Sequence, residues 1–176
     1  MMPLITSKTL LTSISLFHMT LAFFFLTSPS TVNDQILVYI LGESMGIPIS
    51  RGFDAPSAPL ALLAVVLAFL GLSDLVSLSM PEELGSLYHW GTQAPLRSFI
   101  TMVLVFYSYF QSARVPRGSS SAHDASLRGG NLTNRVVFTF AFLEMITWFW
   151  IWVTLREERH GIIERMRKQG PGVRGQ

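Results

Sequence analysis

The stretch that decides the fold of this chain is VVFTFAFLEMITWFWIWVTL, Val136–Leu155, which is long and apolar enough to cross a bilayer as one helix. Near its middle stands a single acidic side chain, Glu144. A carboxylate at that depth costs at least ~2.5–3.5 kcal/mol on insertion scales, and such side chains usually face a partner or a cavity. The stretch therefore indicates a membrane protein and makes Glu144 the first candidate functional residue.

Three further apolar runs precede this one, namely Thr9–Leu26, Ala58–Ser79 and Pro95–Gln111. Each is long enough to cross a hydrocarbon core of ~30 Å at 1.5 Å per residue. The third run is the weakest, because serine, threonine and tyrosine side chains dilute it. Only 14% of the 176 residues are charged, against about 25% in a soluble domain. We therefore predict an all-α membrane protein with four transmembrane helices, formed by residues 1–160 as one domain.

Two shorter amphipathic or apolar segments lie outside these runs. Val32–Leu41 is too short to cross, and Thr31 as N-cap and Gly42 at the end predict a short interfacial helix in the first loop. Residues 161–176 form a basic tail in which apolar side chains share one side and basic ones surround them. This pattern predicts an amphipathic tail helix lying on the membrane surface and binding anionic lipid headgroups.

The distribution of positive charge predicts the orientation of the bundle. With four spans, the termini and the second loop share one side and hold eight of the 13 lysines and arginines, and the opposite side holds five. Cytosolic segments carry the excess of such residues, so both termini are predicted to be cytosolic. The first run exceeds the ~7–15 apolar residues of a signal peptide, which favours an uncleaved first span.

Small and aromatic side chains suggest how the spans pack. One side of the second run is lined by Ala61, Ala64, Ala68 and Gly71, a stripe that lets another helix approach closely. Asp74 borders this stripe on a helical wheel. The last run ends in Trp148, Trp150 and Trp152, which we interpret as an aromatic belt at the membrane interface.

Asp74 and Arg97 form the first predicted pair of intramembrane polar residues. Asp74 lies near the end of the second run and Arg97 near the start of the third, and one short loop joins the two runs. Both side chains therefore face the same side of the membrane, and a buried ion pair between them is the most economical arrangement. Such a pair either clasps a helical hairpin or takes part in transport.

His18 and Glu144 form the second group of candidates, since each lies near the middle of its own run. They can hydrogen-bond if the first and last spans are neighbours, or Glu144 can stand apart in its neutral, protonated form. Thr147 and Thr154 share the Glu144 side of the helix and form a thin polar stripe. The stripe suits packing or assembly, a proton or cation path, or catalysis, and the sequence leaves all three open.

The motifs of common enzyme classes were not found in the sequence. It has no cysteine, which excludes disulfides, thiolate metal sites and cysteine nucleophiles. Metalloprotease, serine-hydrolase and phosphate-loop motifs are missing too. We therefore expect no enzyme activity, no catalytic residue, no metal and no cofactor. The basic residues flank apolar runs and are not interleaved with exposed aromatics, so no nucleic-acid partner is expected.

Three blocks of the sequence together resemble one known family. They run from Leu26 to Glu43, from Ser73 to Arg97 and from Phe142 to Arg159. The pattern is similar to the fungal increased-loss-of-mitochondrial-DNA membrane proteins over about residues 7–160. The resemblance implies a fungal multi-pass protein of the endoplasmic reticulum, linked genetically to maintenance of the mitochondrial genome. It supplies no catalytic residues.

Taken together, these observations predict a multi-pass protein of the endoplasmic reticulum with a non-enzymatic accessory or scaffolding role, required only indirectly for mitochondrial DNA. Location in a mitochondrial membrane is the alternative. The expected partners are the lipid bilayer and another membrane protein or further copies of this chain. The competing function is a small ion or proton channel or transporter that uses Asp74 and Glu144.

Overall fold

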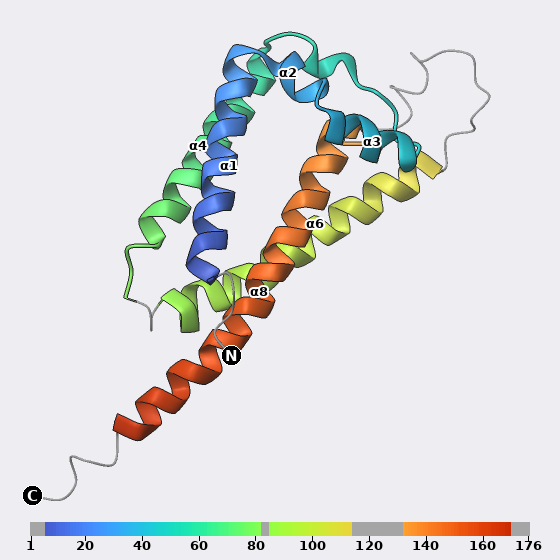
Figure 1. Cartoon of the computed structure of the whole chain (residues 1–176). Helices are drawn as coiled ribbons and strands as arrows, with labels where there is room; N and C mark the ends of the chain where they lie inside the picture. Colours follow the sequence, from blue (N-terminus) through green and yellow to red (C-terminus); the bar gives the residue numbers. More distant parts are fainter. Residues whose placement is uncertain (1–5, 82–84, 114–131, 170–176) are drawn as a thin grey trace, which may run out of the picture.

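The computed structural model describes residues 6–81, 85–113 and 132–169. Within these ranges every regular element is helical (Figure 1), which confirms the predicted all-α class. The elements in chain order are α1 (Ser7–Thr27), α2 (Pro29–Asn33), α3 (Ile36–Ser44), η1 (Arg51–Phe53), α4 (Ala58–Ser77), η2 (Gly85–His89), α6 (Trp90–Ala113) and α8 (Arg135–Gln169).

Helices α1 and α4 lie side by side as an antiparallel pair (Figure 1). Their close approach depends on the predicted stripe of small residues, in which Ala64 and Gly71 are buried and Ala61 and Ala68 are partly buried. A Cβ atom placed on Gly71 would lie 2.7 Å from the backbone oxygen of Ser15 in α1. The stripe therefore sets the distance between the two helices, and the packing prediction is confirmed.

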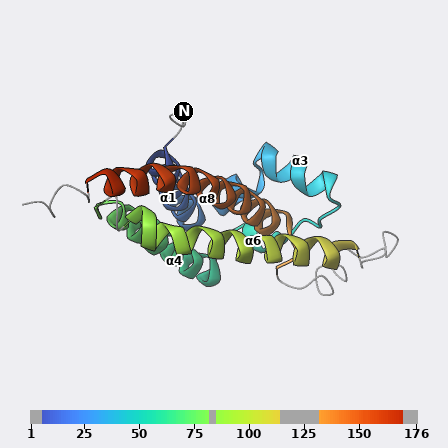
Figure 2. The same ribbon diagram turned by 90° about the horizontal axis from the view of Figure 1, so that it is seen from below.

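Helices α6 and α8 form the second antiparallel pair and cross one another, as Figures 1 and 2 show. Helix α6 begins at Trp90, earlier than the predicted start at Pro95, because the short π-helical turn η2 leads directly into it. Trp90 is buried and stacks on Trp148 of α8, with 6.2 Å between the ring centroids. At the other end, the Ser108 hydroxyl donates to the backbone oxygen of Leu132 at 3.1 Å.

Three helices of the described chain are long and apolar enough to cross a membrane: α1, α4 and residues Arg135–Gly161 of α8. The prediction of four such helices is therefore not met, since α6 falls short. Its hydroxyl groups and Arg97 lower its hydropathy, the same dilution that makes the third run the weakest. Helix α6 nevertheless runs from the end of the bundle where α4 stops to the end where α8 begins (Figure 1).

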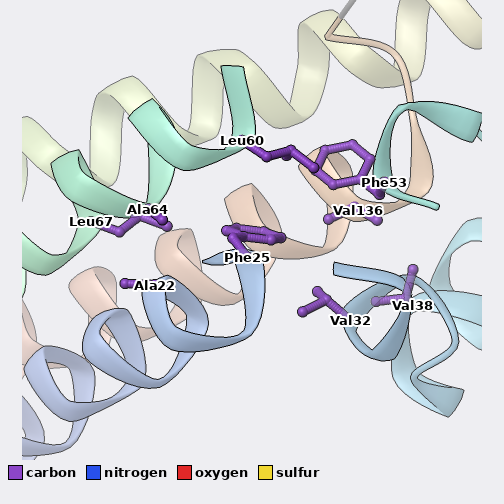
Figure 3. Packing of buried hydrophobic residues seen from close by; sticks show 9 residues of the cluster. All are labelled: Ala22, Phe25, Val32, Val38, Phe53, Leu60, Ala64, Leu67 and Val136. Carbon is purple, nitrogen blue, oxygen red and sulfur yellow. The ribbon is translucent and has the colours of Figure 1, made fainter. Parts of the chain in front are cut away.

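The predicted interfacial helix Val32–Leu41 is two helices instead of one. Ser28 precedes α2, Pro29 takes its first turn, and Gln35 is extended (φ −62°, ψ 133°) before α3. In one continuous helix Val32 and Val38 would point about 120° apart. The break lets both reach the same apolar cluster, where Figure 3 shows them.

Helix α3 also continues past Gly42, the predicted end. Gly46 ends it, with a φ of 65° that suits glycine. The Gly46 and Ile47 N–H groups donate to the backbone oxygens of Glu43 and Gly42, a Schellman motif. Gly42 has a different task, because a Cβ there would lie 2.3 Å from Arg135 Cγ, so it allows α3 to pack against α8.

The predicted tail helix is not a separate element, because α8 continues without a break from Arg135 to Gln169. At 1.5 Å per residue this helix is roughly 50 Å long, and its last part projects beyond the other helices (Figure 1). The side chains of Ile162 and of residues 165–169, and all of residues 170–176, lie outside the described part of the chain. The amphipathic character of the tail therefore stays a prediction.

The buried apolar residues form three clusters along the bundle. One joins α1, α4, η1 and the α2–α3 segment at one end, and its residues are drawn in Figure 3. A second joins the first half of α1 to the start of α6 and the middle of α8. The third lies between α6, α8 and Ile47. The candidate polar residues lie among these clusters.

Candidate intramembrane polar site

Asp74 and Arg97 meet in a two-pronged ion pair between α4 and α6. Arg97 Nη1 donates to Asp74 Oδ2 at 2.7 Å, and Nη2 donates to Oδ1 at 3.0 Å. Asp74 is only 2% exposed, whereas the Arg97 side chain retains 25% exposure. Parallel donation of this kind is the strongest geometry for a guanidinium and a carboxylate. The predicted pairing is therefore confirmed, and it clasps the α4–α6 hairpin.

Glu144 contacts two side chains inside the bundle. The Trp148 indole N–H, one turn further along α8, donates to Glu144 Oε2 at 2.7 Å. His18 of α1 places Nε2 at 2.8 Å from Oε1. Of the two arrangements left open, the structure thus shows the one in which α1 and α8 are neighbours and His18 faces Glu144. Both side chains are almost fully buried.

The contact between His18 and Glu144 is close but is not a well-aligned hydrogen bond. Within the described residues, Glu144 Oε1 and His18 Nδ1 both lack a hydrogen-bond partner. The His18 ring also lies against Phe17 and Phe140, at 6.3 and 6.1 Å between centroids. The His18 imidazole and the Glu144 carboxyl group therefore face each other in apolar surroundings.

Trp148 connects the two groups of polar residues. It is fully buried, and the Arg97 guanidinium carbon lies 4.6 Å from the centre of its ring, a cation–π distance. The contacts therefore run in order through His18, Glu144, Trp148, Arg97 and Asp74. The four residues singled out in the sequence thus belong to one continuous network across α1, α8, α6 and α4.

The sequence interpretation of Trp148 as part of an aromatic belt is wrong, although Trp150 and Trp152 are exposed as that interpretation requires. The available signal was the spacing of four residues between Glu144 and Trp148, which places both on one face of a helix. Of the two threonines in the predicted polar stripe, Thr154 is buried and Thr147 is partly buried. The Thr147 hydroxyl donates to the Leu143 backbone oxygen of its own helix at 2.8 Å.

Arg135 is a structural residue that the sequence analysis did not single out. Its Nε donates to the Ile47 backbone oxygen at 2.9 Å, and its Nη2 lies 2.6 Å from Glu43 Oε2. The guanidinium also stands 5.7 Å from the centre of the Tyr39 ring. Arg135 therefore fastens α3 to the start of α8, and the basic residue immediately before an apolar run was its only sequence signal.

Glu158 is a second residue of this kind. One of its carboxylate oxygens accepts from the Ser7 backbone N–H at 3.0 Å, and the other accepts from the Ser7 hydroxyl. The N-terminus of α1 has unpaired N–H groups and a partial positive charge, so a carboxylate is stabilised there. Glu158 thus ties the start of α1 to the part of α8 that follows its apolar run.

The histidine and acidic side chains of the network are arranged as contacts between helices. Among the described residues, no group of three or more histidine or acidic side chains is arranged to hold a metal ion. Each carboxylate is engaged by a donor or cation from another position, as the contacts above show. The arrangement can hold four helices together, and it places ionisable groups in the interior of the bundle.

Comparison with known proteins settles the family. The sequence pattern of a family described as increased loss of mitochondrial DNA protein 1 matches residues 5–165. The chain belongs to this family. The resemblance found in the sequence is thereby confirmed, and all five network residues lie within the matched range. Membership relates the protein to the maintenance of mitochondrial DNA.

The sequence of one relative also matches most of this chain. Protein ilm1 of Schizosaccharomyces pombe is 26% identical over 145 residues, which cover 82% of this chain and 77% of the relative. No solved structure matches the chain.

Proposed function

We propose that this family member is a non-enzymatic scaffold or accessory protein of the endoplasmic reticulum membrane, and that its loss affects mitochondrial DNA indirectly. In this proposal the chain crosses the membrane four times, with α6 as the third crossing and both termini in the cytosol. A mitochondrial membrane is the alternative location. The family relation to mitochondrial DNA supports a role in its maintenance, and the three apolar helices support a membrane location.

The observation that carries the proposal is the engagement of both buried carboxylates by side chains from other helices. Asp74 holds Arg97 of α6, and Glu144 contacts His18 of α1. Burying a charge without a partner in an apolar interior is costly, and satisfying it within the bundle favours one particular arrangement of helices. The polar residues thus hold the helices of the fold together, which suits a scaffold.

The exposed apolar surface of α4 favours a partner within the membrane. Its large apolar side chains are more than half exposed at Leu62, Val65, Phe69, Leu72 and Val76. Such a face contacts lipid chains or another apolar helix. A membrane protein or a second copy of the chain is the partner that this surface suits.

The competing function is an ion or proton path through Asp74 and Glu144. One observation favours it, since both carboxylates belong to one connected network. The link between them is the Trp148 indole, which offers one N–H donor and no acceptor. A proton arriving at Glu144 therefore has no relay through this ring to Asp74. The geometry supports assembly better than conduction.

The test combines purification with reconstitution. The full-length protein is isolated in mild detergent from its native host, and co-purifying proteins are quantified by mass spectrometry. A partner in near-equal amount, with no proton or potassium flux in proteoliposomes, supports the scaffold. A flux that Glu144→Gln abolishes while Thr147→Val leaves it intact would instead establish the channel, because Thr147 is bonded within its own helix.

A further inference from the structure

An apolar cavity of about 320 Å³ lies between α1 and α8 next to the α2–α3 segment. Four of the residues that line it are drawn in Figure 3, namely Phe25, Val32, Val38 and Val136. Exposed side chains of Thr20, Gln35 and Leu37 form part of its edge, so it opens outward between the helices. Its volume falls at the lower end of the range of about 300–1,000 Å³ typical of small-molecule sites.

The lining contains one buried polar group without a partner. Thr139 of α8 is 3% exposed and lines the cavity. Within the described residues its hydroxyl oxygen has no hydrogen-bond partner. The hydroxyls of Thr12, Ser15 and Thr20 instead donate to the backbone oxygen four residues earlier. Burying an unpaired hydroxyl in apolar surroundings is unfavourable, so this group indicates a ligand oxygen in the cavity.

The other polar side chains of the lining already have internal partners. Thr20 donates to Leu16 O, Gln35 donates to Thr31 O, and the Thr31 hydroxyl contacts that of Ser28. Thr31 and Gln35 belong to the α2–α3 segment, Thr139 lies about one turn from the start of α8, and Thr20 lies on the exposed edge. Further along α1 and α8, the walls are Phe17, Leu21, Phe140 and Leu143. The lining is thus mainly apolar along its whole length, and the one buried unpaired hydroxyl among its described residues lies near the end of the bundle.

One unpaired hydroxyl in an otherwise mainly apolar lining favours a lipid over water as the natural occupant. A buried water needs two to four polar partners, whereas the free hydroxyl here is that of Thr139. A bilayer lipid carries its ester oxygen near the interface and its acyl chain toward the membrane centre. An acyl chain that enters between α1 and α8 would run along the two helices, beside the apolar residues of the lining.

We propose that this cavity binds one acyl chain of a bilayer phospholipid, whose ester carbonyl oxygen accepts a hydrogen bond from Thr139. The occupant would pack between α1 and α8 beside Phe140, the ring that lies against His18. Lipid binding at this cavity does not depend on the scaffold role, and each can be tested without the other.

The experiment uses the full-length protein in nanodiscs of phosphatidylcholine that include a fraction of phosphatidylcholine with a diazirine in one acyl chain. After irradiation, labelled peptides are located by mass spectrometry. We expect label on the α1 and α8 residues that line the cavity. Thr139→Val keeps the shape but removes the donor, and should lower cavity labelling roughly fivefold, the effect of about one hydrogen bond.

The control is Thr147→Val on the same helix, which removes a hydroxyl that is bonded to Leu143 O and is not part of the cavity. It should label like the unmodified protein. Leu143→Phe fills part of the cavity and should lower labelling without unfolding, as checked by its melting temperature. The proposal fails if Thr139→Val labels normally, or if cavity and outward-facing α4 residues label alike. Displacement of the label by free palmitic acid, but not by excess phosphatidylcholine, would also overturn the phospholipid assignment.

Discussion

At the residue scale, Glu144 is the side chain whose chemistry separates the two functions. Its two oxygens face His18 and the Trp148 N–H, in an interior where charge is costly. In a scaffold, what matters is that these groups stay satisfied. In a conducting path, what matters is that the carboxyl group can gain and lose a proton.

Replacing Glu144 with glutamine tests which property is needed. Glu144→Gln keeps the shape and an oxygen to accept from Trp148 but cannot ionise, so we expect near-normal growth and retention of mitochondrial DNA in cells lacking the native protein. Glu144→Leu leaves His18 and Trp148 without their partner, which should lower the stability of the protein by about 1–3 kcal/mol for each group. We therefore expect this variant not to restore growth or mitochondrial DNA. Growth, mitochondrial DNA content and protein level are measured together.

The informative contrary result is a Glu144→Gln protein that accumulates and localises normally yet is inactive. It would show that ionisation of Glu144 is required and would favour the proton path. Thr147→Val serves as the matched control on the same helix, since its hydroxyl is bonded within α8 and lies outside the network.

The Asp74–Arg97 pair makes a second prediction at this scale. Asp74→Asn and Arg97→Gln should each lower stability in detergent by on the order of 1–3 kcal/mol, less than a fully buried pair because Arg97 is partly exposed. The double variant should lose less than the sum, with a coupling of about 0.5–3 kcal/mol. Thermal unfolding of the four proteins measures this, and strict additivity would show that the pair contributes no interaction energy.

At the scale of elements, glycine decides how closely helices approach. Gly71 allows α4 to meet the α1 backbone at Ser15, and Gly42 allows α3 to meet Arg135. In a membrane, helix association relies on packing more than on the hydrophobic effect, so loss of such a contact is not easily replaced.

Gly71→Ala is therefore expected to destabilise the protein by about 1–3 kcal/mol, the usual cost of overpacking. The clash is with the Ser15 backbone oxygen, which no change of rotamer can relieve. Gly161→Ala in α8 is the control, because a Cβ there meets nothing within 4 Å and alanine favours the helix by ~1 kcal/mol. Melting temperatures compare the two, and equal stability of both variants would contradict the role given to Gly71.

At the scale of the whole molecule, connectivity and hydropathy give different answers for α6. Because of its composition, α6 has a lower hydropathy than the apolar stretches of the other three helices. Its position takes the chain from the end of α4 to the start of α8, which lie at opposite ends of the bundle (Figure 1). If α1, α4 and α8 cross the membrane, α6 must cross too.

Single cysteines test this topology, because the natural chain has none. We expect Ser57→Cys and Ala113→Cys to react with a membrane-impermeant maleimide from the lumen, and Ser79→Cys from the cytosol. The assay compares sealed and permeabilised microsomes. Reaction of Ala113→Cys from the same side as Ser79→Cys would show that α6 does not cross, and would remove the four-span proposal.

The sequence by itself determined the all-helical class with its long apolar helices, the approximate bounds of α1 and α4, the family and the Asp74–Arg97 pair. These follow from local information, namely runs of hydropathy, the spacing of small residues and one short loop that brings two helix ends together. The tertiary structure decided what depends on which helices are neighbours. His18 meets Glu144 because α1 packs against α8, Trp148 turns inward because the α6 start covers it, and the helix breaks at Gln35 so that Val32 and Val38 share one cluster. Contacts between residues of different helices leave no periodic signal, since they arise from packing of whole surfaces, and the cavity between α1 and α8 is formed in the same way.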